Sequence, residues 1–318
     1  MKRNKFNRFR LAAHCYQSGL SLIELMVGML IGLLLVAVAG AAFLGQSANT
    51  RSNDESSRIQ ETGRLAISSI ERSLRYAGFV PFGEVIDSNK ALGDYCKFPT
   101  VSTDIASGPP SDGPFVEGRD GTGHLNSSDR LVYRMFGSGL DSQADGDGGI
   151  RDCRGESVPS PAAASPNVVN TLYVDTDVGG EPALFCRVRI PGAATASVTQ
   201  ALVPGVESMQ VQYIVDASTP TVSKRQLLRA SQVSDWSKVL AVKISLMLRG
   251  EVNSRADKDT KVTDMFDEDY TSSAGAGHTG ASFDPAVTVA GAAQFRLRRV
   301  FTTTVEFRNS PGLSSLCI

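Results

Sequence analysis

The feature that most constrains this chain is an apolar run from Leu20 to Leu44, in which Glu24 is the only ionisable side chain. As a helix, a run of this length would extend about 37 Å, which is enough to cross the hydrocarbon core of a bilayer. The first 19 residues carry five basic side chains and no acidic one. Because basic residues stay on the cytoplasmic side, the pattern places residues 1–19 in the cytoplasm and the chain beyond residue 45 outside.

Two simple interpretations of this run each leave something unexplained. A secretory signal peptide has an apolar core of about 7–15 residues followed by a small-residue cleavage site, whereas this run is longer and Ala39–Ala42 forms a poor site. A plain signal anchor has the right length. It does not account for Glu24, because a carboxylate within an apolar span costs about 2.5–3.5 kcal/mol and calls for a compensating charge.

The residues after the apolar run continue a helical pattern. No proline occurs before Pro81, and apolar or small residues recur at steps of three and four. These residues are Ile59, Gly63, Ala66, Ile67, Ile70, Leu74 and Ala77. Charged residues lie mostly on the other side. The pattern predicts one helix from Leu20 to about Ala77, ended by Gly78 and Pro81, with an apolar first half and an amphipathic second half.

The rest of the chain carries strand patterns separated by long loops. Alternating and β-branched runs predict strands at Arg130–Phe136, Thr171–Val174, Leu184–Ile190, Met209–Val215, Val239–Leu248 and Gln294–Phe307. A short helix or turn is expected around Gln226–Trp236. Residues 80–130 and 137–170 are predicted as loops with isolated short strands, and residues 250–290 as a mobile surface excursion. We therefore expect an α+β fold, in which the long N-terminal helix packs on a largely antiparallel β-sheet domain.

Four cysteines follow the basic leader and lie far apart: Cys96, Cys153, Cys186 and Cys317. An even number suits two disulfides in an oxidising compartment, but the spacing alone allows three pairings. Buried free thiols are the alternative. No two of these cysteines have the CxxC spacing that is typical of zinc and dithiol redox sites.

One acidic loop partly matches a calcium-binding pattern. Gln143, Asp145 and Asp147 stand at positions one, three and five of such a loop, but position twelve is Arg154 and not the bidentate glutamate. The loop is therefore predicted to be a solvated turn, and we expect no metal and no cofactor.

Catalysis and nucleic-acid binding have no support in the sequence. The three histidines, His14, His124 and His278, lie in the leader and in predicted loops, and hydrolase, Walker-type and zinc-hydrolase motifs are missing. Without the leader the chain has 27 basic and 33 acidic residues, with no basic cluster in the sequence that would suit a phosphate backbone. We expect neither an enzyme nor a nucleic-acid partner.

The segment from Gly19 to Leu25, GLSLIEL, resembles the prepilin peptidase site of type IV pilins, with Leu20 where phenylalanine is commonest. The resemblance implies that prepilin peptidase cuts after Gly19 and that the new amino group of Leu20 is methylated. It also implies that this amino group pairs with the Glu24 carboxylate of a neighbouring subunit during assembly. The two opposite charges would then neutralise each other within an apolar bundle.

Five further blocks, in order, resemble the PilW family of minor pilins: residues 60–79, 128–134, 201–216, 234–249 and 296–309. The resemblance implies a minor pilin that primes assembly of the type IV pilus and lies at or near its tip, with roles in twitching motility and adhesion. Its implied partners are other minor pilins, the major pilin and a tip adhesin. It also implies a disulfide between Cys153 and Cys186, which leaves Cys96 and Cys317 to pair or stay free.

This resemblance implies four segments: a cleaved leader (1–19), a transmembrane and filament-core half-helix (20–44), an amphipathic half-helix (45–78) and a β-rich head (79–318). The precursor would lie in the inner membrane with its head in the periplasm and would later join the pilus. One alternative is a minor pseudopilin of a type II secretion system, which shares the signal and the plan. The other is a signal-anchored periplasmic binding module or enzyme, which would keep its leader and tolerate loss of Glu24.

Overall fold

The computed structural model describes residues 19, 21–80, 98–100, 111–121, 125–138, 146–159, 168–189, 197–219, 221–253, 255, 257–266, 282–289 and 291–309. Leu20, Cys96, Gln143, Asp145, Cys317 and the three histidines lie outside this part, so the predictions made for them stay predictions. Residues 1–50 form one compact unit and residues 51–318 form a second, which we call the head unit.

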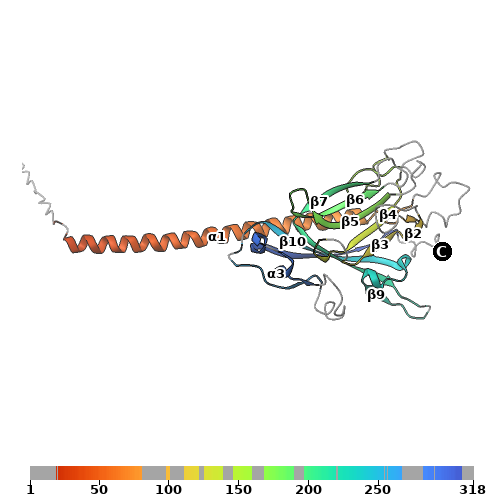
Figure 1. Cartoon of the computed structure of the whole chain (residues 1–318). Coiled ribbons are helices and arrows are strands. Elements are labelled where there is room, and N and C mark those ends of the chain that lie inside the picture. The colour runs from red at the N-terminus through yellow and green to blue at the C-terminus, as the bar shows by residue number, and fades with distance from the viewer. Residues whose placement is uncertain are drawn as a thin grey trace, which may run out of the picture. The chain divides into compact units, whose positions relative to one another are not determined.

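Helix α1, Leu22–Leu74, is the longest element and belongs to both units (Figure 1). No proline interrupts it, and it ends in a turn over residues 75–78. Gly78 closes this turn with a φ of +74°, a conformation that favours glycine. The predicted long helix is confirmed. It ends at Leu74, three residues before the predicted end at Ala77, because residues 75–78 form a turn.

Two antiparallel sheets make up most of the head unit. The larger has the strand order β3-β4-β5-β6-β7, with β3 (Val116–Arg119), β4 (Arg130–Met135), β5 (Val168–Thr176), β6 (Pro182–Arg189) and β7 (Val198–Pro204). The second has the order β13-β10-β8-β9, with β8 (Val206–Asp216), β9 (Arg225–Leu228), β10 (Val239–Asn253) and β13 (Arg296–Glu306). Each of the six predicted strands overlaps an observed strand, and the predicted α+β fold is confirmed.

Short elements complete the described structure. Two strand pairs are β1 (Phe98–Thr100) with β2 (Ser111–Gly113), and β11 (Thr263–Asp264) with β12 (Ser282–Phe283). Single helical turns are η2 (Leu125–Ser127), η3 (Ala230–Gln232), η4 (Trp236–Lys238), α3 (Pro285–Thr288) and η5 (Gly291–Phe295).

One hydrophobic core joins the second half of α1 to the inner faces of both sheets. From α1 it takes the predicted stripe, from Ile59 to Ala77, and β5 and β6 of the larger sheet lie against β8 of the second. The sheets contribute Leu131, Leu172, Leu184, Val211, Tyr213, Ile244 and Leu246 among others. The buried stripe of α1 and the inward-facing residues of the strands therefore pack in one cluster.

The helix approaches the second sheet closely at Gly63. A Cβ atom at this position would collide with the ring of Phe301 on β13, so only glycine allows this approach. Further along, the Thr303 hydroxyl donates a hydrogen bond of 2.6 Å to the carboxylate of Glu71. After the helix ends, the Gly78 N–H donates to the carbonyl of Arg134 on β4, which ties the chain to the larger sheet as well.

One local prediction is confirmed and another was wrong. The expected short helix or turn around Gln226–Trp236 is present as the single turns η3 and η4, which follow strand β9. The described parts of residues 250–290 do not form a purely polar surface excursion: β10 runs on to Asn253, and Met265 and Phe283 pack with Met247 on the outer face of the second sheet. Beside them, the Ser245 hydroxyl donates to the carbonyl of Met265.

A buried carboxyl group, Asp129, connects the two sheets. It directly precedes β4, yet one carboxyl oxygen accepts the N–H of Val211 on β8 and the other accepts the N–H of Gly121, both at 2.8 Å. Its own N–H donates to the carbonyl of Met209. Burial raises the pKa of Asp129 to about 8, against these hydrogen bonds, which lower it, and the nearby charge of Asp120 adds to the increase.

We predict that Asp129 makes the head unit less stable as the pH rises from about 4 to 8. The folded state holds the Asp129 proton up to about pH 8, while the unfolded chain releases it near pH 4. This contribution to stability is complete below about pH 4 and is lost on the way to pH 8. Urea unfolding of the Asp129→Asn variant should therefore show less decline over this range than the wild-type protein.

Asp235→Asn is the matched control, because the hydrogen bond from the Ser237 hydroxyl lowers the pKa of Asp235. The contribution of Asp235 is therefore present above pH 4 and is lost in more acidic solution. Parallel stability curves for the wild-type protein and Asp129→Asn between pH 4 and 8 would contradict the assignment.

Candidate assembly site

Ser21 and Glu24 build the start of α1. The Glu24 N–H donates to the Ser21 hydroxyl at 3.2 Å and to its carbonyl at 3.1 Å, which satisfies one of the first donors of the helix. The sequence Ser-x-x-Glu has the spacing of a capping box, a signal that could have placed the helix start at Leu22 instead of Leu20. Glu24 therefore lies in the first turn, where the positive end of the helix favours a carboxylate.

Gly19 lies before this cap and is exposed. The chain is not helical at Gly19 or at Ser21, and a Cβ atom at Gly19 would meet no atom within 4 Å. The predicted cleavage point thus borders an exposed, non-helical residue directly before the capped helix. Leu20 is outside the described part of the chain.

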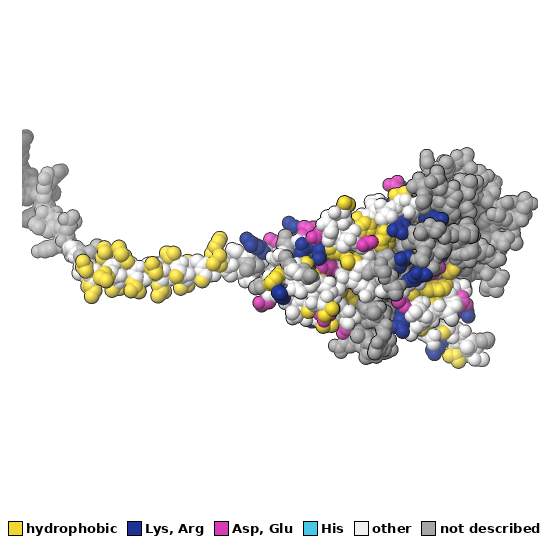
Figure 2. Space-filling model, in the orientation of Figure 1, with side chains coloured by type: hydrophobic (Ala, Val, Ile, Leu, Met, Phe, Trp, Pro, Cys, Tyr) yellow, Lys and Arg dark blue, Asp and Glu magenta, His cyan; other side chains and the backbone are white. Residues whose placement is uncertain are grey.

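The first half of α1 exposes its apolar side chains all around the helix, and Figure 2 shows those on the face in view. The exposed large residues are Leu22, Ile23, Leu25, Met26, Val27, Met29, Leu30, Ile31, Leu33, Leu34, Leu35, Val36, Val38, Phe43 and Leu44. By length and composition α1 could cross a membrane, and its most apolar window is not buried by any part of the structure. Burial of each such side chain would contribute about 1.5–3 kcal/mol, so this surface is suited to a bilayer or to other apolar helices.

The second half of α1 is held by the head unit from Glu55 onward. Glu55 and Ile59 are almost completely buried. Gly250, in the last part of β10, makes room for the Glu55 carboxylate, because a Cβ atom at Gly250 would overlap it. One helix therefore carries an exposed apolar surface in its first half and a buried stripe in its second.

A charged cluster lies where β8, β10 and β13 meet. The buried Glu207 carboxylate accepts hydrogen bonds from Arg298 at 2.7 Å and from Arg249 at 3.1 Å. Arg249 also pairs with the half-exposed Glu181, which accepts a further bond of 2.9 Å from Arg296. This last bond is the main cause that lowers the pKa of Glu181. Each carboxylate is paired with two arginines, which gives the cluster a structural role at the junction of the three strands.

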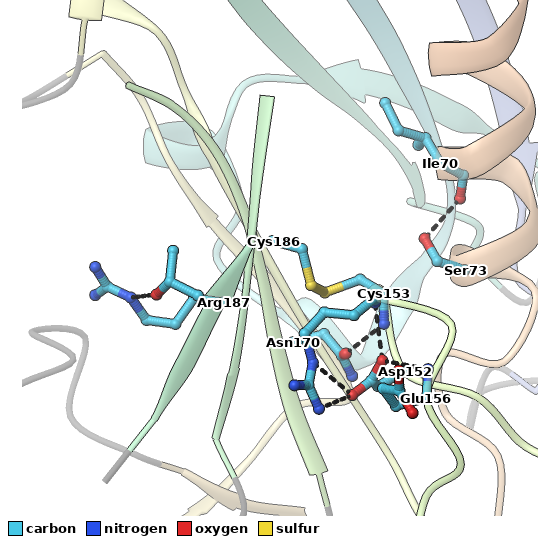
Figure 3. Close-up of a disulfide and its surroundings, with 10 residues drawn as sticks. Ile70, Ser73, Asp152, Cys153, Glu156, Asn170, Cys186 and Arg187 are labelled. Atoms are coloured by element: carbon cyan, nitrogen blue, oxygen red, sulfur yellow. Dashed lines mark hydrogen bonds and ion pairs between the residues drawn. A yellow bond between two sulfur atoms is a disulfide. The ribbon is translucent and has the colours of Figure 1, made fainter. Parts of the chain in front are cut away.

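The predicted disulfide pair lies at the larger sheet, β3-β4-β5-β6-β7. Cys153 and Cys186 are joined by a disulfide with a Cα–Cα distance of 5.9 Å, which is the pair that the family resemblance implies (Figure 3). Cys186 is on β6, and Cys153 lies in the connection between β4 and β5. The Cys153 N–H donates to the side chain of Asn170 on β5 at 2.9 Å, so the connection is attached to two strands.

Asp152 shapes the turn that carries Cys153. One of its oxygens accepts the N–H groups of Arg154 and Glu156, and the other accepts the Arg154 guanidinium at 2.6 Å. Gly155, with a φ of +89°, closes the turn. These hydrogen bonds shape the turn without the help of the disulfide, and the disulfide attaches the turn to the sheet.

The structure offers no metal centre at the acidic loop as far as it is described. Asp147 is exposed, and one of its oxygens accepts the Ser138 hydroxyl at 2.7 Å and the Gly149 N–H at 2.8 Å. The bond from Ser138 is the main cause that lowers the pKa of Asp147. Among the described residues no group of three acidic, histidine or cysteine side chains could hold a metal ion.

We predict that loss of the disulfide lowers the free energy of unfolding by about 3–4 kcal/mol, because the bridge closes a loop over a sequence separation of 33 residues. Cys153→Ala, Cys186→Ala and the double variant should lose similar amounts in urea unfolding, since either single change breaks the same bond. If the two single losses simply add up in the double variant, the cysteines act as independent packing residues.

Comparison with known proteins identifies both ends of this arrangement. Residues 15–40 match the prokaryotic N-terminal methylation motif, and residues 171–309 match the type IV pilus-assembly protein W model. Among solved structures, a type IV-like pilin from Thermus thermophilus is similar, with a TM-score of 0.38 and 16% identity over 80% of this chain and 98% of that chain. No curated protein matches the chain.

The two sequence matches fall on different parts of the structure. The methylation motif covers the cap, Glu24 and most of the exposed apolar half of α1, whereas the second match runs from within β5 to just beyond β13. Proteins of the pilin family are structural and not enzymatic. Over residues 171–309 the chain therefore matches the type IV pilus-assembly protein W family, and over residues 15–40 it carries the N-terminal methylation motif.

Proposed function

We propose that the chain is a minor pilin, made as a membrane-anchored precursor, cut by prepilin peptidase after Gly19 and used to prime assembly of a type IV pilus at or near its tip. One observation carries the proposal: the methylation motif coincides with a half-helix whose apolar side chains are all exposed. Such a surface is stable in the bilayer of the inner membrane and equally stable against the apolar helices of other subunits.

Glu24 has a defined task in this scheme. Cleavage creates an amino group on Leu20, which is cationic at neutral pH, about one helical turn before Glu24. In an apolar bundle either charge alone costs several kcal/mol, while a pair formed between neighbouring subunits removes both penalties. The pair therefore favours the correct axial offset between subunits and disfavours an unpaired insertion.

The head unit supplies the contacts that distinguish this subunit from others. Its proposed partners are the other minor pilins, the major pilin and a tip adhesin, which it would meet after the first half of α1 has left the membrane for the filament. The family match supports a pilus over the type II secretion system, because the matching model describes a pilus-assembly protein.

The first test of this function is the mass of the mature protein. In cells with prepilin peptidase we expect an N-terminus at Leu20, with one added methyl group, and in cells without the peptidase an intact leader. The protein is extracted from membranes and its N-terminal peptide is sequenced by mass spectrometry. A cut near Ala42, or an unprocessed leader in both strains, would contradict the proposal.

The second test separates processing from assembly. Glu24→Val should reduce incorporation into sheared pili at least tenfold, because the Leu20 amino group loses its partner, while cleavage after Gly19 continues. Immunoblots of the pilus and membrane fractions measure both effects. Glu61→Val, which changes an exposed glutamate in the second half of α1, should leave both unchanged. Normal incorporation of Glu24→Val would exclude the charge pair as the driving interaction.

A further inference from the structure

The two faces of the larger sheet differ in chemistry. Along β6, Cys186 points into the core, and Arg187 points away from it on the other side of the strand (Figure 3). Alternation and register place Val169, Thr171 and Tyr173 of β5 on the same outer face as Arg187. The same rule places Thr199 and Ala201 of β7 there.

Two basic side chains of β6, Arg187 and Arg189, lie on this outer face. Among the described residues, the acidic side chains of the face are Glu117 and Asp175. Glu117 is paired with the buried Arg134 at 2.7 Å, and Asp175 lies at the end of β5 that is remote from Arg189. The partly exposed Arg187 and Arg189 make β6 the basic strand next to the sheet edge.

Strand β7 forms that edge, and its stretch Val198–Ala201 lies before the register shift with β6 and before Pro204. Among the described strands it pairs with β6 alone, and its residues Val198–Ala201 are exposed although they point alternately to both faces. It contains no charged residue. The other edges of the two large sheets, β3, β9 and β13, all contain charged residues, which is a usual protection against pairing with another chain.

Arg187 is held in place over this edge. Its Nε donates to the Thr199 hydroxyl on β7 at 3.2 Å, and its Nη2 donates to the Tyr173 hydroxyl at 3.3 Å. The guanidinium also lies 5.2 Å from the centre of the Tyr173 ring, which stacks on Phe185. A guanidinium fixed in this way loses little entropy when it binds a carboxylate.

We propose that β7 accepts an extended segment of another protein as a sixth strand, and that this segment carries carboxylate side chains at alternate positions, on the face of Arg187 and Arg189. The backbone of β7 would supply strand hydrogen bonds, and the two arginines would select the acidic side chains. The proposal does not depend on leader processing, so the two can fail separately.

Charge decides between the possible occupants. A second copy of this chain, paired through β7, would bring Arg187 and Arg189 of both copies to the same side of one sheet, where like charges repel. A nucleic acid would satisfy the arginines but would leave the β7 backbone without strand partners. An acidic peptide strand satisfies both.

The test uses the full-length protein in detergent and an end-blocked, fluorescent peptide of alternating valine and aspartate, with binding followed by anisotropy. We expect saturable binding that weakens at least tenfold in the variant with both Arg187→Glu and Arg189→Glu. Arg225→Glu, on the edge strand β9 of the other sheet, is the matched control and should bind normally. Hydrogen exchange should slow at β7 when the peptide is added, and stay unchanged at β9.

A second peptide, identical but N-methylated at alternate residues, keeps its charges and cannot form strand hydrogen bonds. Its failure to bind is the expected result. Equal binding of the methylated peptide, unchanged exchange at β7 or stronger binding of a duplex oligonucleotide would each overturn the proposal, as would the absence of saturable binding. Circular dichroism and intact disulfide mass establish that the charge-reversal variant is folded.

Discussion

The burial of one stripe of α1 is the contact on which the head unit depends. The stripe from Ile59 to Ala77 closes a core to which both sheets contribute, so part of the inner face of the sheets would be uncovered without it. Gly63 makes the fit specific, since the ring of Phe301 occupies the space that any larger residue would need. A helix that slid or rotated would present a side chain to that ring, and the register of helix on sheet is thereby set by sterics as well as by hydrophobicity.

Buried polar groups then fix the strands of the second sheet to one another and this sheet to the larger one. Asp129 replaces a neighbouring strand for the N–H groups of Val211 and Gly121, and Glu207 gathers arginines from β10 and β13. Burying such a group without a partner costs free energy, whereas a hydrogen-bonded group favours one defined arrangement of its partners. They link segments that hydrophobic contacts alone would allow to shift, so the two halves of the core meet in one arrangement.

The helix and the central strands could be predicted because their periodicity reports burial directly. The spacing from Ile59 to Leu74 and the alternation in β10 both reflect one buried face. Strand β7 escaped prediction because most of it is exposed on both faces and leaves no alternating pattern. Met265 and Phe283 escaped it because the polar residues around them dominate the composition of that stretch.

The candidate sites divide in the same way. Gly19 and Glu24 form a local motif that can be recognised in the sequence alone. The Ser21 cap could be recognised in the same way, from its spacing to Glu24. The position of Arg187 beside an open edge depends on the register between the three successive strands β5, β6 and β7. No short motif contains that information, because register is a property of the assembled sheet.

The position of the disulfide also has a consequence for the order of events during secretion. Cys186 is fully buried and Cys153 almost so, which leaves an oxidising enzyme no access to either sulfur once the sheet and helix have closed over them. Oxidation must therefore come before final packing, while β6 and the Asp152 turn are still open to solvent. The disulfide therefore forms only in chains that reach an oxidising compartment before they finish folding.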